Sequence, residues 1–433
     1  MYSKRLGVAA AVILAASFLT FHHSFAQTSL YENLLQDQGV ITGGVGVSVI
    51  DGQSYFTMSL RPDLAFGKWG VGLDIPLRFD VDTGNLRNED WDQGYDYLRL
   101  FRYVRYSRKR NPDPVYARVG SLDAARLGHG FIMNYYSNSL VIDQRKVGME
   151  FDFDFGIGGF ETVTNNFGRG EIFGGRIYYR PLQLATNAPI LRNFAIGATY
   201  VGDIDPDEYR GTDNGVSEFG FDAELPIVQT PLLRLAIYGD VAKINNHGSG
   251  KATGIEMNLT GIANLFDVGA QLERRFLNRE FLPSYFGPLY ELERRTKEDT
   301  LEAQQKKLRG TYGLLYGQVL NTLRLVGSFE RLDGVPQSGR LHLEATVPDA
   351  VPNIAMRAYY DDTRVDKLSD VFNMDENSAA RVGIGYKLNQ FLILYMDYAW
   401  TFKFDQATQK YKVQRRFEPQ LAFAYTFPLG GGR

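Results

Sequence analysis

Residues 71–81 read Val71-Gly72-Leu73-Asp74-Ile75-Pro76-Leu77-Arg78-Phe79-Asp80-Val81. Every odd position of this stretch is apolar, and every even position is polar, glycine or proline. A period of two places alternate side chains on opposite faces of an extended chain, whereas a helix needs three- and four-residue spacing. The stretch therefore predicts a β-strand with one wholly apolar face.

The same alternation recurs along the chain. From Lys146 to Phe155, an apolar residue stands at every odd position, while the even positions include Glu150, Asp152 and Asp154. Further alternating stretches are 56–60, 219–227, 233–237, 266–272 and 392–402. Helical spacing is absent from all of them, so an all-β fold is predicted.

Strand length distinguishes a membrane barrel from a soluble β-sandwich, which also alternates. Several stretches reach about 10 to 12 residues, which matches the length that crosses an outer membrane at a tilt. We count about twenty candidate strands, of which one or two could be false, and single-chain bacterial barrels have even strand numbers. The prediction is a transmembrane antiparallel up-and-down β-barrel of about 18 strands, with a range of about 16 to 20.

Composition excludes several classes of protein. The chain has no cysteine, which rules out disulfides, thiol catalysis and a lipoprotein anchor. No segment after Ala26 offers the long apolar run of a membrane helix. The formal net charge of −3 argues against nucleic acid as a partner. The aromatic content, with 26 Tyr and 29 Phe, suits strands.

The N-terminus has the form of a cleaved export signal. Lys4 and Arg5 precede a short apolar run, and Ser24-Phe25-Ala26 resembles a cleavage site. We therefore expect four segments and a location in the cell outer membrane. They are a signal peptide at 1–26, a short periplasmic segment at 27–39, the barrel at 40–427 and a tail at 428–433.

The connections between the predicted strands fall into two sets. Tight turns are expected at 67–70, 156–158, 230–231, 261–265, 321–322 and 388–390. Long connections are expected at 82–94, 123–144, 204–215, 277–310, 362–379 and 403–414. Barrels have short periplasmic turns and longer outer loops, so the first set should face the periplasm. The stretch 182–193 breaks this order.

The last strand carries a family resemblance. Phe417, Leu421, Phe423, Tyr425 and Phe427 alternate with polar or small residues. This run resembles the aromatic final strand of bacterial outer-membrane β-barrel proteins of the porin-like kind, although residues 428–433 follow it. Residues 174–182 also look like such a strand. The resemblance implies outer-membrane lipids and the barrel assembly machinery as partners, and it indicates no single functional family.

Motifs with chemistry are weak. The glycine-rich stretch 245–252 lacks the first glycine and the final hydroxyl of a phosphate loop, so it reads as a turn. The oxygen-rich stretch 80–90 suits either an ordinary turn or calcium. The charged stretch 289–308 predicts a short helix with a solvated face. No nucleophile motif accompanies His129, His247 or His342, so we expect no enzyme, cofactor or metal.

A channel is the function that the sequence favours. Residues 123–144 would form the third outer loop, which porins fold into the lumen. The expected pore-lining residues are Asp123, Arg126, His129, Glu150, Asp152, Asp154, Arg176 and Arg180. Cross-strand ion pairs that only stiffen the wall are an equal alternative. We expect passive passage of small hydrophilic solutes. The alternatives are a surface-exposed structural or adhesive barrel, a hydrophobic-substrate transporter and, last, an outer-membrane hydrolase. Solute and oligomeric state stay open.

Overall fold

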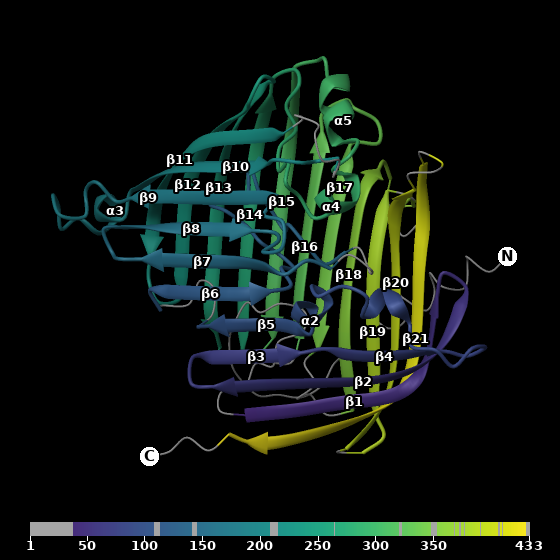
Figure 1. The fold of residues 1–433 in the computed structure, drawn as a ribbon. Helices are drawn as coiled ribbons and strands as arrows, with labels where there is room; N and C mark the ends of the chain where they lie inside the picture. Colours follow the sequence, from purple (N-terminus) through teal and green to yellow (C-terminus); the bar gives the residue numbers. More distant parts are fainter. Residues whose placement is uncertain are drawn as a thin grey trace.

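The computed structural model describes residues 38–429, apart from 108–112, 141–144, 208–214, 264, 320–322, 348–352, 368, 372–373, 376, 390, 406–407 and 409. The expected signal peptide, residues 27–37 of the expected periplasmic segment and residues 430–433 of the expected C-terminal tail lie outside the described residues. Within them, one antiparallel sheet contains every strand (Figure 1).

The strands follow one another around the sheet in chain order, except that β3 and β4 together occupy one strand position, since both pair with β2. Their bounds are β1 Gln38–Ile50, β2 Gln53–Phe66, β3 Trp69–Leu73, β4 Ile75–Asp80, β5 Phe101–Tyr106, β6 Val115–Gly120, β7 Gly148–Asp154, β8 Gly158–Thr164, β9 Ile172–Tyr179, β10 Ala195–Asp203, β11 Val216–Gln229, β12 Leu233–Ile244, β13 Ser249–Ile262, β14 Phe266–Leu277, β15 Leu308–Val319, β16 Leu323–Leu332, β17 Gly339–Val347, β18 Ile354–Val365, β19 Ser378–Lys387, β20 Leu392–Asp405 and β21 Lys410–Pro428.

The first and last strands close the sheet. β1 pairs with β2 on one edge and with β21 on the other, from Gln38 opposite Pro428 to Ile50 opposite Arg416. Figure 1 shows these two strands side by side, β1 in purple and β21 in yellow. The predicted closed antiparallel barrel is confirmed. It has 20 strands rather than 18, because short candidates such as β5 and β6 also take places in the wall.

One predicted strand is partly wrong. One of the roughly twenty candidate strands counted from the sequence covers 95–107, but the first half of this stretch forms the helical turn α2, Asp96–Arg99, and only the second half is extended. The Asp96 carboxylate accepts a hydrogen bond of 2.9 Å from the Gln93 backbone N–H, and such a local acceptor competes with strand pairing. This turn lies beside the break between β3 and β4, where the Asp74 N–H donates to the Leu100 carbonyl.

The two sets of connections lie at opposite ends of the barrel. The tight connections after β2, β7, β11, β13 and β19 share one end with the start of β1 and the end of β21. The connections after β4, β6, β10, β14 and β18 lie at the other end, called here the long-loop end. The stretch 180–194, which contains α3 (Pro189–Arg192), is a longer connection at the tight-turn end.

The two faces of the wall differ as the alternation predicts. In β14, Leu272 is 56% exposed, whereas its neighbours Gln271 and Glu273 are buried inside the barrel. On other strands of the wall, Phe221 of β11 and Leu315 of β15 are also exposed on the outer face. Apolar side chains outside and polar side chains inside are the arrangement of a barrel that spans a lipid bilayer. No helix among the described residues is long and apolar enough to cross a membrane.

The faces of β7 give a first prediction. Asp152 is the cross-strand partner of Tyr116 on the neighbouring strand β6, and Tyr116 is buried on the inner face. Phe151 lies on the opposite face, where its ring is 5.5 Å from the Phe160 ring between centroids. Phe151→Arg should impair barrel assembly, because a cation on the lipid face near the midplane costs about 2 to 4 kcal/mol. Asp152→Arg should assemble. Heat-modifiable migration of the purified variants measures both, and equal impairment would reverse the assigned faces.

Candidate functional site in the barrel interior

The connection between β6 and β7, residues 121–147, folds into the barrel, and we call it the inner loop. Its central side chains are almost fully buried: Leu127, Phe131, Met133 and Tyr136 are at most 4% exposed. A surface loop could not bury these side chains, so the barrel interior supplies their surroundings. The third outer loop is therefore inside the lumen, as its place in the topology predicts. Residues 141–144 of this loop lie outside the described part.

A second connection, residues 278–307 between β14 and β15, turns inward and packs on the inner loop. Met133 and Phe286 form a parallel bridge between the two, and the Phe131 and Phe281 rings lie 5.6 Å apart. We call their shared apolar core the plug cluster; it contains Leu127, Phe131, Ile132, Met133, Tyr136, Phe281, Leu282, Tyr285, Phe286, Tyr290 and Leu301. Burial of each large side chain contributes about 1.5–3 kcal/mol.

The plug cluster rests mainly on one side of the barrel. Its wall contacts are inward apolar residues of β8 to β14, among them Val163, Val201 and Ile244. A smaller cluster joins Leu289 and Leu292 of the second connection to Phe402 of β20 at the long-loop end. Most of the plug cluster is therefore held against β8–β14, and the interior beside β17–β21 and β2–β4 contains mainly polar and charged side chains.

Buried charges tie both inward connections to the wall. Arg294 contacts Asp203 at 2.8 Å and Glu171 at 2.8 Å. Lys146 contacts Glu171 at 2.7 Å and Glu291 at 2.8 Å. We call these five residues the charged latch. Burial alone would raise the pKa of the Glu291 carboxyl, but the Lys146 and Arg294 charges lower this pKa to about 2. Glu291 is therefore ionised at neutral pH.

The latch corrects an expectation for residues 289–308. The predicted helix exists as two short pieces, α4 (Tyr290–Glu293) and α5 (Lys297–Ala303). Its charged face was expected in solvent, yet Arg294 and Lys297 are buried. Arg294 finds Glu171 and Asp203 outside this segment, and the local sequence pattern does not contain these partners. Lys297 pairs with Glu293 within the segment at 2.6 Å.

His129 anchors the turn of the inner loop to β11 and β12. Its Nδ1 lies 3.3 Å from Asp240 Oδ1, its Nε2 lies 3.2 Å from Glu224 Oε2, and its ring stacks on Tyr238 at 4.0 Å. Burial would lower the pKa of this imidazole, but the hydrogen bonds and charges of Asp240 and Glu224 raise the pKa to about 10. The charged ring therefore holds the loop. Arg126 adds a 2.8 Å hydrogen bond to Gln271.

The predicted charges on β7 and β9 form cross-strand contacts. Arg176 on β9 lies 2.7 Å from Asp222 on β11, and Arg180 lies 2.8 Å from Asp154 at the tight-turn end. Glu150 accepts from the Tyr116 hydroxyl at 3.4 Å. Of the expected acids, Asp154 meets Arg180, whereas Arg176 pairs with Asp222 of β11. The ion pairs of Arg176 and Arg180 are of the kind expected if these charges only stiffen the barrel wall.

A polar cavity of about 60 Å³ lies on the other side of the inner loop. Its walls come from the inner loop, from β2 and β4, and from β17 to β21. The charged residues that line it are Arg61, Asp74, Arg78, Asp90, Asp123, Arg145, His342, Glu344, Asp361, Arg381 and Arg416. Of the eight residues expected from sequence to line a pore, Asp123 is the one that borders this cavity.

Charges of both signs are interleaved around the cavity. Arg78 lies between Asp90 at 2.9 Å and Glu418 at 3.0 Å. The Asp74 carboxylate forms ion pairs with Arg61 at 2.9 Å and with Arg145 at 3.2 Å. Such mutual neutralisation keeps the buried charges tolerable while it leaves their polar edges facing the cavity. The arrangement can hold or pass a small polar solute.

Sequence reasoning missed all five arginines that line the cavity. Arg381 and Arg416 lie on inner positions of their strands, and this alternation was a readable signal for the face. Their meeting with Arg61 and Arg78 depends on closure of the barrel through β1 and β21. Strand phase alone does not say which inner faces stand near the inner loop.

The oxygen-rich stretch 80–90 is a turn in the structure. Asp80 Oδ1 accepts from the backbone N–H groups of Asp82 and Thr83, at 3.0 and 2.8 Å. Asp90 instead points to Arg78 and Arg87, both at 2.9 Å. Among the described residues, no group of three acidic, histidine or cysteine side chains is arranged to hold a metal ion.

Comparisons with known proteins give only distant structural matches. No family model and no curated protein matches the chain. Among solved structures, OccK9 (OpdG) from Pseudomonas aeruginosa is 10% identical with a TM-score of 0.33, over 90% of this chain and 98% of that one. OccK11 (OpdR) from the same organism is 12% identical with a TM-score of 0.29, over 94% and 100%.

CdiB from Acinetobacter baumannii is 8% identical with a TM-score of 0.28, and the match spans 90% of this chain and 60% of CdiB. At such values, the assignment rests on the molecule itself. A closed antiparallel sheet with a lipid-compatible outer face and a charged interior satisfies all backbone groups within a bilayer. The chain forms a closed antiparallel β-barrel of the outer-membrane type.

Proposed function

We propose that the protein is a passive channel for small hydrophilic solutes. The observation that carries this proposal is the polar cavity between the inner loop and the wall of β17–β21 and β2–β4. An inward loop that narrows a lumen, with charges of both signs along the gap, selects solutes by size and charge without tight binding.

The size of the cavity supports a constriction. A cavity of about 60 Å³ is small and admits water-sized groups. A larger solute would have to displace side chains that line the cavity, among them the partly exposed Arg145. Because the lining is charged, an apolar solute would have to desolvate these groups. This cost disfavours the hydrophobic-substrate transporter.

The residues expected from sequence take different parts in this proposal. Asp123 belongs to the constriction itself. We assign Glu150, Asp152, Asp154, Arg176 and Arg180 to the lumen wall along β7 and β9. Arg126 and His129 would act on the pore indirectly, since they hold the inner loop in place.

Ion preference tests the proposed route. Replacing Arg145 and Arg381 by Gln removes two positive charges from the cavity and leaves Asp74 and Asp397 without those partners. The reversal potential in planar bilayers under a salt gradient should then shift toward cations. Neutralising Glu150 and Asp152 together should shift it toward anions. If the purified protein shows no conductance, or neither pair alters selectivity, the structural-barrel alternative takes the place of the channel.

The charged latch gives a prediction about the plug. Arg294→Gln leaves Asp203 and Glu171 buried without their cation, and breaking such a pair costs about 3–5 kcal/mol. Protected amides of residues 290–303 should exchange at least about a hundredfold faster, and open-channel conductance should rise. Lys306→Gln removes the same charge from an exposed site in the same connection and should change neither. An unaltered exchange rate in Arg294→Gln would show that the latch does not hold the plug.

The inner loop should loosen at high pH. The imidazole of His129 has a pKa of about 10 in place and an ordinary value of about 6.5 when released. Its attachment is therefore complete below pH 6.5 and is lost as the pH rises toward 10. Conductance of the wild type should increase across this window. His129→Gln should already be higher at pH 7 and should lack that increase. A parallel rise in both proteins would assign the effect to other groups.

A further inference from the structure

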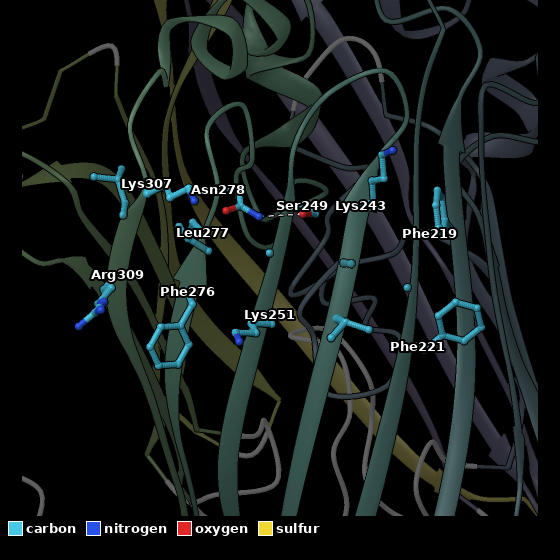
Figure 2. Close-up of a pocket in the computed structure, with 15 residues that line it drawn as sticks. Phe219, Phe221, Lys243, Ser249, Lys251, Phe276, Leu277, Asn278, Lys307 and Arg309 are labelled. Atoms are coloured by element: carbon cyan, nitrogen blue, oxygen red, sulfur yellow. Dashed lines mark hydrogen bonds between the residues drawn. The ribbon is translucent and has the colours of Figure 1, made fainter.

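The outer face of β11–β15 carries a groove of about 710 Å³ near the long-loop end (Figure 2). One row of cross-strand partners runs across its floor: Phe221, Val241, Lys251, Phe276 and Arg309. Directly paired residues share a face of a sheet. The exposed Phe221 and Val241 identify this face as the outer one.

A second row lies nearer to the loops. Phe219 pairs with Lys243, which in turn pairs with Ser249. Asn278 donates to the Ser249 hydroxyl at 2.9 Å, and Lys307 borders the same groove just before β15. Figure 2 shows both rows, with Lys243, Lys251, Lys307 and Arg309 distributed along them. All four cations are exposed.

These four cations have no carboxylate partner among the residues that the structure describes. Other outer-face arginines do: Arg331 contacts Asp366 at 3.2 Å, and Arg274 donates to Asp333 at 3.1 Å. Asp333 also lies within electrostatic range of Arg309, but its hydrogen bonds go to Arg274. The groove therefore presents four cations without the carboxylate contacts that Arg331 and Arg274 have.

The cations are positioned around an aromatic ring. Lys251 Nζ lies 5.7 Å and Arg309 Cζ 5.8 Å from the centre of the Phe276 ring. Cation–π attraction of this kind favours side chains that stay near the ring over side chains that extend into solvent. Lys251 and Arg309 stand on strands separated by one other strand, so their backbones are about 10 Å apart. A single anionic headgroup can reach both.

An apolar hollow continues down the same wall. It measures about 750 Å³ and includes the outer side chains Leu225, Ile237, Ile255 and Leu272. Ile237 and Leu272 are 43% and 56% exposed. A cationic groove above an apolar hollow, on the same five strands, has the two-part chemistry of a lipid: a charged headgroup and acyl chains.

We propose that this groove binds the phosphorylated headgroup of a lipid in the outer leaflet, with its acyl chains along the hollow below. Lys and Arg form charge-assisted hydrogen bonds to phosphate oxygens, and a phosphate can compensate the positive charge that the wall itself leaves unpaired. The long-loop end is the outer end of a bacterial barrel, so the groove lies at the level of that leaflet. The site is independent of the proposed channel, because every cation named faces away from the lumen.

Native mass spectrometry of the full chain in detergent, with added diphosphoryl lipid A, tests the site. The wild type should retain this lipid, and fully dephosphorylated lipid A should bind at least about tenfold more weakly. The double variant Lys243→Gln/Lys251→Gln should lose about tenfold or more in affinity for the diphosphoryl form. Millimolar inorganic phosphate should not compete, because it lacks the acyl chains.

Matched single variants separate the groove from general charge. Lys251→Gln should weaken binding, whereas Arg331→Gln, an outer-face cation already paired with Asp366, should not. Heat-modifiable migration checks that each variant is folded. Equal binding of both lipid forms, or equal loss in Lys251→Gln and Arg331→Gln, would overturn the proposal. Displacement of the lipid by inorganic phosphate alone would overturn it in favour of a simple anion site.

Discussion

The pairing of β1 with β21 is the constraint on which the rest of the structure depends. A bilayer offers no water to the edge of a sheet, so each unpaired N–H or carbonyl group there would cost several kcal/mol. Closure removes both edges, and it also divides space into an outside that meets lipid and an inside that need not. The alternation of side chains then has a physical meaning on each strand.

The inner loop and residues 278–307 pack mainly against one side of the barrel interior, and pairs of opposite charges hold them there. The inner loop carries apolar residues into a lumen whose wall is polar, so it needs a partner surface; residues 278–307 supply it through Phe281 and Phe286. Buried ions such as Arg294 and Glu291 are tolerated because each meets an opposite charge. The plug leans on β8–β14, and the space that remains lies against β17–β21 and β2–β4.

Much of this fold was predictable from the sequence, because a period of two is a local property. The barrel, the faces of strands such as β7 and the two sets of connections follow from it, whereas the inward third loop was predicted from its place in the topology by analogy with porins. The burial of Arg294 and the gathering of Arg61, Arg78 and Arg416 were not predictable. These depend on contacts between residues far apart in the sequence, such as Arg78 with Glu418, and no periodicity encodes them.

Strands β11–β15 serve two surfaces at once, and the same period of two makes this possible. Lys251 faces the outer groove, while the adjacent Ala252 belongs to the plug cluster's wall. On β12, Val241 lies on the outer floor and Asp240 holds His129 inside. A change at an outer position therefore leaves the inner contacts of the same strand in place. The wall that supports the inner loop can bind a lipid headgroup on its other face without a compromise in sequence between the two tasks.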